Sequence, residues 1–336
     1  MTSTRWDVRR LARDAVSIGA SRRTDIPALF GSWLWRRIEA GWAEYVPAGP
    51  PRRLRCSLRP EHVTHFTFWS KWPRPFLRVF DRIRERGYPT LWQVTITGLG
   101  GTPVEPHVPE PARVVASVRA LAHRIGPAAI CWRYDPIFVS TRHDAAFHLE
   151  TFRRLAGELA GLVDRVVVSF VAPYGRRVLP DLRAYGREHA DAVVALPLSE
   201  QVDLVGRLAT TARAEGIPLA VCCMPALRRT LGLPRAGCNA WSWAVRAWPE
   251  LRSFGPLRAR PCRPDCGCSV EIDIGAYDTC VLGCRYSYGT CREGVARRRL
   301  AAHRPDAPGI VATAPHARPA RRHTSHDVVV HADSER

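Results

Sequence analysis

Six of the eleven cysteines lie within 30 residues of one another, between positions 262 and 291. The run SVEIDIG at 269–275 divides them and is rich in β-branched residues, as is typical of a buried strand. The cysteines therefore form two groups of three on either side of a strand: Cys262, Cys266 and Cys268, then Cys280, Cys284 and Cys291. Thiolates are the ligands of zinc and iron–sulfur centres. This spacing predicts a metal site at the end of a sheet.

The N-terminal sequence and the lack of long apolar runs favour a cytoplasmic protein. Residues 1–16 contain no apolar core of a secretory signal. No apolar run approaches the ~20 residues that a membrane helix needs. In a reducing compartment, clustered cysteines serve as metal ligands or redox groups more often than as disulfides.

The chain is strongly basic, with a formal net charge of +19. Such a charge predicts attraction to an anionic partner, either a small molecule or a nucleic acid. However, Lys71 is the only lysine among 50 basic residues, and the arginines are spread along the chain. A compositional bias toward arginine explains the same charge, so the sequence leaves both explanations open. A single lysine in a chain that otherwise uses arginine is a candidate proton donor. An ammonium can release its proton, whereas a guanidinium cannot.

Hydrophobic periodicity predicts strands and helices in alternation. The predicted helices span 29–41, 75–87, 111–124, 144–160 and 199–214, and the seven predicted strands span 16–20, 65–72, 90–97, 129–134, 165–171, 217–223 and 269–275. This rhythm is typical of α/β proteins built from parallel (β/α) units, and we expect a barrel-like fold. Residues 16–303 are predicted to form a single domain, with an N-terminal arm at 1–15 and a disordered tail at 304–336. The chain has no glycine-rich nucleotide-binding motif, which argues against the common nucleotide-binding folds.

Polar side chains follow several of the predicted strands. The carboxyl ends of parallel strands share one edge of a sheet or barrel, so these side chains are expected to meet there. The arginines are predicted to bind an anionic group, and the aspartates to orient the arginines or a ribose hydroxyl. The predicted rim consists of Arg22, Lys71, Thr97, Arg133, Cys222 and Cys280. Arg23, Asp25 and Asp135 follow the same strands and are further candidates for ligand contact.

Four motifs, SIGASRRTDIP, FWSKWP, WRYDPI and CGCSVEIDIGAYDTCVLGCRYSY, resemble a bacterial family known as domain of unknown function 1848. The resemblance extends from about residue 16 to 308. Members usually end this region with Cys-x3-Cys-x2-Cys, similar to the cluster loop of radical S-adenosylmethionine enzymes, and the family is distantly similar to the spore photoproduct lyase branch. The resemblance implies a [4Fe–4S] cluster with an open iron that binds S-adenosylmethionine. Because the loop follows the last strand, it also implies a circularly permuted partial TIM barrel.

The chain departs from the family pattern at the third cysteine. Cys280 and Cys284 match the first two ligands, but Ser287 occupies the third position, and serine is a poor iron ligand. Three outcomes remain open: Cys291 replaces the missing ligand, Cys266 or Cys268 completes the set, or the cluster is lost and the chain is a degenerate member. Cysteines also tend to occur in the family at the positions of Cys222 and Cys238, which would form an auxiliary site with Cys266 and Cys268, unless Cys222 and Cys223 are core residues.

Three functions follow as hypotheses. The first is an iron–sulfur protein resembling radical S-adenosylmethionine enzymes, with Lys71, Arg133 and Asp135 in catalytic roles. The second is a barrel stabilised by zinc, in which four thiolates close a tetrahedral site without redox chemistry. The third is a nucleic-acid-binding protein that uses arginine and aromatic residues. The sequence identifies neither a substrate nor a reaction.

Overall fold

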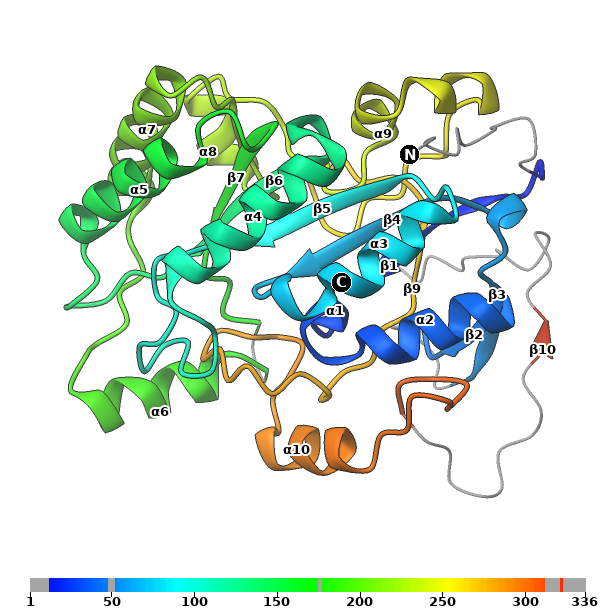
Figure 1. Ribbon diagram of the computed structural model, residues 1–336. Helices are drawn as coiled ribbons and strands as arrows, with labels where there is room; N and C mark the ends of the chain where they lie inside the picture. The colour runs from blue at the N-terminus through cyan, green and yellow to red at the C-terminus, as the bar shows by residue number, and fades with distance from the viewer. Residues whose placement is uncertain (1–11, 48–51, 175–176, 312–320, 323–336) are drawn as a thin grey trace.

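A seven-stranded parallel sheet forms the centre of the molecule (Figure 1). The structure, a computed structural model, describes residues 12–47, 52–174, 177–311 and 321–322. The strands lie in the order β8-β7-β6-β5-β4-β1-β9. Their bounds are β1 (Val16–Ala20), β4 (Val63–Ser70), β5 (Thr90–Thr95), β6 (Ile130–Ile137), β7 (Arg165–Phe170), β8 (Leu219–Val221) and β9 (Glu271–Asp273).

The strand order agrees with the predicted (β/α) succession. Strands β4 to β8 follow one another in chain order, and β9, the SVEIDIG strand, pairs with β1 in parallel. A barrel places its last strand beside its first in this way. Closure is not observed, however, because within the described residues β8 and β9 are the two edges of the sheet and do not pair with each other. The fold is therefore an open α/β sheet with a barrel-like strand order.

Helices cover one face of the sheet (Figure 1). The side chains that alternate toward this face form the main core, which includes Phe68, Trp92 and Trp132. The rings of Phe68 and Trp92 have centroids 4.8 Å apart. The longer helices are α2 (Gly31–Ala40), α3 (Leu77–Glu85), α4 (Pro111–Ile125), α5 (Ala145–Leu159), α6 (Leu179–His189) and α7 (Leu198–Ala214).

The opposite face of the sheet is covered by the segment between β8 and β9. This segment contains only short helices, α8 (Pro225–Thr230) and α9 (Trp241–Ala247). Trp243 of α9 packs against Leu91 and Cys131 in a second, smaller core. The same face carries buried polar residues such as Gln93 and Arg133, which alternate with the apolar residues of the main core. The functional candidates lie on this polar face.

Further short elements complete the fold. A second sheet contains β2 (Trp42–Tyr45), β3 (Leu54–Ser57) and β10 (Arg321–Arg322). The chain stays packed past residue 304, where the tail was predicted to begin: Trp33 donates to the Ala307 carbonyl at 2.9 Å. The rest of that predicted tail, 312–320 and 323–336, lies outside the described residues, as does most of the predicted arm. The remaining short helices are α1 (Ile26–Leu29), α10 (Glu293–Ala301), and the 3-10 turns η2 (Pro60–His62), η3 (Arg74–Phe76), η4 (Pro127–Ala129) and η5 (Pro249–Phe254).

None of the helices in the described part of the chain has the length and apolar character to cross a membrane.

Asp191 connects the end of α6 to the loop that follows β6 through hydrogen bonds. Its fully buried carboxylate accepts hydrogen bonds from the Ser140 hydroxyl at 3.0 Å, the Thr141 hydroxyl at 2.9 Å, the Arg142 amide at 3.0 Å and the Tyr185 hydroxyl. Burial alone would raise the pKa of Asp191, but these hydrogen bonds outweigh it and lower the pKa below the ordinary 3.8.

Replacing Asp191 with alanine is expected to lower the free energy of unfolding by about 2–4 kcal/mol, because buried donors lose their acceptor. A lowered folded pKa means that this stabilisation is present above about pH 4 and is lost as the pH falls. Urea unfolding should therefore show a smaller difference between wild type and variant at about pH 3 than at about pH 6. Asp203→Ala, at a carboxylate with 71% exposure, is the control and should change little. An equal effect of the two substitutions would contradict this role for Asp191.

Candidate metal centre

Six cysteines from three separate segments meet beyond the carboxyl end of β8. Each thiol lies close enough to at least one other for hydrogen bonding between them to shift its pKa. One pair has full hydrogen-bond geometry, with the two sulfurs 3.7 Å apart. Four of the six are buried, one is partly buried, and one is exposed. This six-cysteine group consists of Cys222, Cys223, Cys238, Cys262, Cys266 and Cys268.

Backbone hydrogen bonds hold the three segments together. The Ala236 amide donates to the Val221 carbonyl at 2.9 Å, and the Gly267 amide donates to the Ala236 carbonyl at 3.0 Å. The chains approach so closely that a Cβ atom on Gly237 would lie 2.5 Å from the Gly267 carbonyl oxygen. A Cβ atom on Gly267 would lie 2.8 Å from the Ala236 carbonyl oxygen. Each of these glycines adjoins a cysteine, so their small size is what lets the thiols converge.

Three arginines donate hydrogen bonds to sulfurs of the group. Arg22 reaches Cys262 at 2.7 Å and Arg133 reaches Cys238 at 3.0 Å, while Arg263 lies 3.8 Å from the sulfur of Cys222. Arg22 follows β1 and Arg133 lies on β6, so strands that are far apart in the sheet contribute to the same site.

Two of the six thiols are favoured as thiolates. Hydrogen bonds from Cys222 and Cys268 lower the pKa of Cys238 well below its ordinary value, and Arg133 adds to this effect. Hydrogen bonds from Cys223 and Cys262 likewise lower the pKa of Cys266. Hydrogen bonding within the group and burial raise the pKa of the other four thiols. The thiolate is the form that binds metals. The chemistry of this donor set therefore fits a thiophilic metal or an iron–sulfur cluster.

The cysteines nevertheless contact one another rather than a common centre. Within the described ranges, no three histidine, cysteine, aspartate or glutamate side chains are arranged around a point where they would hold a metal ion. Binding would require the thiols to rotate toward a shared position.

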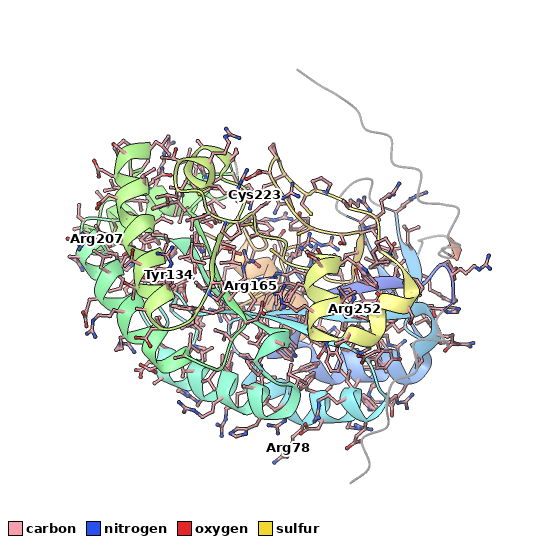
Figure 2. The ribbon with its side chains drawn as sticks, turned by 90° about the horizontal axis from the view of Figure 1, so that it is seen from above. Arg78, Tyr134, Arg165, Arg207, Cys223 and Arg252 are labelled. Atoms are coloured by element: carbon pink, nitrogen blue, oxygen red, sulfur yellow. The ribbon has the colours of Figure 1, made fainter. Side chains whose placement is uncertain are left out.

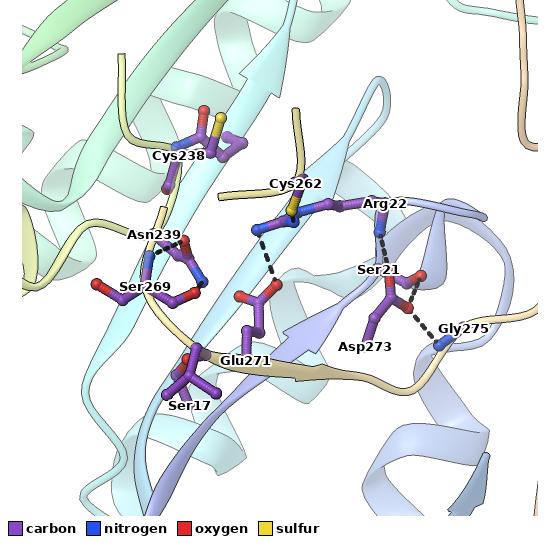
Figure 3. A network of polar contacts seen from close by, with 12 residues as sticks. Ser17, Ser21, Arg22, Cys238, Asn239, Cys262, Ser269, Glu271, Asp273 and Gly275 are labelled. Carbon is purple, nitrogen blue, oxygen red and sulfur yellow. Dashed lines mark hydrogen bonds and ion pairs between the residues drawn. The ribbon is translucent and has the colours of Figure 1, made fainter. Parts of the chain in front are cut away.

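A polar network connects this group to β1 and β9 (Figure 3). The Arg22 guanidinium lies between Cys262 and Glu271, with an Nη2–Oε1 distance of 3.2 Å, and stacks over the Trp69 ring at 4.9 Å. Burial raises the pKa of Glu271 to about 7, against the opposing effect of Arg22. Asp273 accepts hydrogen bonds from the Arg22 amide at 3.0 Å and from the Ser21 hydroxyl. The network fixes Arg22 in place under the cysteines.

The other predicted arginine and aspartate ligands are engaged within the protein. Arg23 donates to the carbonyls of Val46 at 2.7 Å and Asp273 at 2.9 Å. Asp135 accepts hydrogen bonds from Arg133 and from the Ser169 hydroxyl. Each of these side chains therefore has a partner in the structure without any bound anion.

A second polar cluster surrounds Lys71, which follows β4. Its ammonium donates to Glu105 at 2.9 Å and to the Tyr286 hydroxyl at 2.9 Å. Thr97 also donates to Glu105, at 2.5 Å, and Asp25 accepts from the Lys71 amide at 2.7 Å. Burial lowers the pKa of Lys71, but Glu105 and Cys284 outweigh it, and the net pKa is raised. The lysine is thus held as a cation, which does not favour a role as a proton donor near neutral pH.

Cys280 and Cys284 belong to this second cluster. Burial raises the pKa of Cys280 to about 11 and raises that of Cys284 further, although Lys71 opposes both shifts. Asp25, whose pKa burial raises to about 6, adds to the shift of both thiols. These two cysteines are therefore held as neutral thiols, in contrast to Cys238 and Cys266.

The last two candidate positions after β9, Ser287 and Cys291, have partners outside both clusters. The Ser287 hydroxyl accepts hydrogen bonds from the amides of Gly289 at 3.2 Å and Thr290 at 3.3 Å, so it serves a local turn. The Cys291 sulfur accepts from Arg177 at 3.5 Å. The residue at the third family position therefore has a structural role in this chain.

The structure divides the candidates at the strand ends into two clusters. Arg22, Arg133 and Cys222 join the cysteines that precede β9, whereas Asp25, Lys71 and Thr97 join those that follow it. Sequence reasoning missed Glu105, Tyr286 and Glu271. Glu105 lies in a loop without a motif, whereas Tyr286 and Glu271 both lie within the motif CGCSVEIDIGAYDTCVLGCRYSY, which was the one available signal.

The arginines outside these clusters are dispersed over the surface. Figure 2 shows Arg78, Arg207 and Arg252 at three different sides of the molecule, and Cys223 near the segment that follows β8. All three arginines are exposed.

Comparisons with known proteins give a family but no function. The family model described as "Domain of unknown function (DUF1848)" matches residues 17–289. No curated protein matches the chain. A solved structure, the carboxyl transferase domain from Rhizobium etli pyruvate carboxylase, aligns with 85% of this chain and 32% of its own length, at 9% identity and a TM-score of 0.22. This chain therefore spans about a third of that protein, and the likeness carries no argument about fold or activity.

Proposed function

The chain belongs to the family described as domain of unknown function 1848, and we propose that it is an iron–sulfur protein whose cluster is bound by the six-cysteine group. The observation that carries this proposal is the convergence of six thiols from three segments, two of them favoured as thiolates, beside three arginines. A [4Fe–4S] cluster without an open iron is held by four thiolates. The best candidates are the four buried cysteines, Cys222, Cys238, Cys266 and Cys268.

A bound cluster would supply one-electron redox chemistry. The protein would influence that chemistry through the charges and hydrogen bonds around the sulfurs. Arg22 and Arg133 place N–H groups 2.7 Å and 3.0 Å from cysteine sulfurs, and hydrogen bonds and positive charge at the sulfurs favour the reduced state. Burial of the four cysteines limits access of water and oxidants to the site.

The proposal moves the cluster away from the position that the resemblance to radical S-adenosylmethionine enzymes implies. In that position, the Ser287 hydroxyl is used by a turn, and Cys280 and Cys284 lie in the separate cluster around Lys71. We propose that this chain is a degenerate member with respect to that loop. The cluster would then be bound by Cys222, Cys238, Cys266 and Cys268, which the resemblance suggested as an auxiliary site.

A structural zinc site is the second candidate. Four buried thiols could close a tetrahedral zinc site, with no open position for a substrate. The position of the cysteines favours this candidate. They lie in the segment between β8 and β9, which has little regular structure of its own and would be held together by a metal. This alternative predicts a colourless protein that unfolds when a chelator removes the metal.

Ser287→Cys tests which cysteine group binds the metal. The substitution restores the family pattern, but the proposal predicts that metal content after anaerobic reconstitution stays the same, because the cluster is elsewhere. Iron and sulfide counts on the variant and wild type provide the measurement, and Ser253→Cys, which adds an exposed thiol, is the matched control. An increase in iron for Ser287→Cys alone would place a cluster at Cys280 and Cys284 and overturn the proposal.

A further inference from the structure

Tyrosine and arginine side chains form a continuous rim beside the six-cysteine group. Tyr174 and Tyr288 have ring centroids 5.2 Å apart at 47°. The Arg263 guanidinium donates to the Tyr174 hydroxyl at 2.6 Å. Arg177 donates to the Tyr288 carbonyl at 3.0 Å and lies over the Tyr277 ring at 4.3 Å. We refer to these five residues as the tyrosine–arginine rim.

The rim is open to solvent and lies next to the candidate metal centre. Tyr174 is 38% exposed, which makes it one of the few large hydrophobic side chains with such exposure, and Arg177 is exposed as well. Arg263 joins the rim to the cysteines through its contact with Cys222. A ligand bound on the rim would therefore approach the six-cysteine group.

The positive charge of the rim is largely uncompensated. Asp135 acts on the Arg263 guanidinium, but its carboxylate is already paired with Arg133. Within the described residues, Arg177 and Arg263 form no ion pair, and their hydrogen bonds go to Tyr288, Cys291, Tyr174 and Cys222. An anionic ligand would gain from this imbalance.

We propose that the tyrosine–arginine rim binds a nucleotide, with the base stacked on Tyr174 and the phosphate paired with Arg177 and Arg263. A tyrosine face and a nearby guanidinium match the two parts of a nucleotide, its planar aromatic base and its anionic phosphate. The nucleotide is either free or part of a single strand, because base pairs in a duplex hide the faces that stacking requires. This inference does not depend on the metal proposal.

Alternative ligands fit the rim less well. An acidic protein surface would pair with the arginines but would leave the exposed tyrosine ring without a stacking partner. The general basicity of the chain also attracts polyanions without any site. Binding at this rim must therefore be separated from binding elsewhere by comparing arginines inside and outside it.

Fluorescence anisotropy with two probes tests the inference: a single-stranded DNA of about 12 nucleotides and a fluorescent adenosine nucleotide. Tyr174→Ala is expected to weaken binding about five- to twentyfold, and Tyr174→Phe to preserve it, because a stacked base is lost only when the ring is removed. Arg263→Gln should reduce the dependence of strand binding on salt by about one phosphate contact. Leu198→Ala and Arg207→Gln, at exposed sites on α7, are the matched controls.

The outcomes separate the two sources of the ligand. Weaker binding of the strand alone by the rim variants identifies a single-stranded nucleic acid, and weaker binding of the adenosine nucleotide alone identifies a free nucleotide. Either result supports the site. If neither probe binds, or if Tyr174→Ala and Arg263→Gln behave like their controls, the inference is wrong. Because both probes are tested on the protein as purified, whichever metal it holds, failure of the iron–sulfur proposal would leave this result interpretable.

Discussion

Replacing Cys266 and Cys268 together with alanine is expected to remove metal from the anaerobically reconstituted protein, whereas the same change at Cys280 and Cys284 leaves it bound. The first pair lies inside the six-cysteine group and contacts Cys223, Cys238 and Cys262. Loss of a residue that only hydrogen-bonds to a metal ligand costs about 10–100-fold in metal affinity, so loss of two direct ligands should exceed about 100-fold.

The two double variants are matched because each removes two thiols from a segment next to β9, one pair before the strand and the other after it. Metal content is measured by elemental analysis, and circular dichroism checks that both variants fold. If Cys280→Ala with Cys284→Ala loses the metal and the other variant keeps it, the cluster site is the one that the family pattern implies. If both variants lose it, a ligand set drawn from both groups is required, which is the outcome that the sequence left open.

Gly237→Val is expected to disrupt the candidate metal centre without removing any cysteine. Its Cβ would lie 2.5 Å from the Gly267 carbonyl oxygen, which belongs to the backbone and cannot move aside as a side chain would. The segment bearing Cys238 must then separate from the loop bearing Cys266 and Cys268. We expect a loss of about 1–3 kcal/mol in the free energy of unfolding and a large fall in metal affinity.

Gly157→Ala is the control for this substitution. Gly157 lies in α5, and a Cβ there would have no heavy atom within 4 Å outside its own helix. Alanine at this position should leave the metal content unchanged and raise stability by up to about 1 kcal/mol, because it favours the helix. Urea unfolding and metal analysis of both variants provide the measurement. Normal metal binding by Gly237→Val would mean that the close approach of these segments is not needed for the site.

The sheet could be predicted because its strands carry strong local patterns. In β5, Trp92 and Val94 alternate with Gln93, and the structure places the first two in the main core and directs Gln93 to the Cys238 carbonyl at 2.6 Å. The short strands β2 and β3 were missed, since four residues such as WAEY or LRCS give too short a pattern. Helix α10 was missed because its sequence EGVARRRLA has no apolar stripe.

The site was harder to predict than the sheet. The resemblance to the family suggested that Cys222 and Cys238 join Cys266 and Cys268, but no local pattern in the sequence brings these distant segments together. Their close approach depends on two glycines, Gly237 and Gly267, whose role is visible only in the packed structure. The prediction that Arg22 and Lys71 share one rim did not foresee that they belong to different clusters. Side chains at the same edge of a sheet can still contact different partners.

Counting iron, acid-labile sulfide and zinc in the wild-type protein, purified and reconstituted without oxygen, tests the central claim most directly. The proposal predicts a brown protein with absorbance near ~400 nm, and iron and sulfide in about equal numbers, about four of each per chain. A colourless protein that retains about one zinc per chain and no sulfide, even after reconstitution, would contradict the iron–sulfur proposal and favour the structural zinc site.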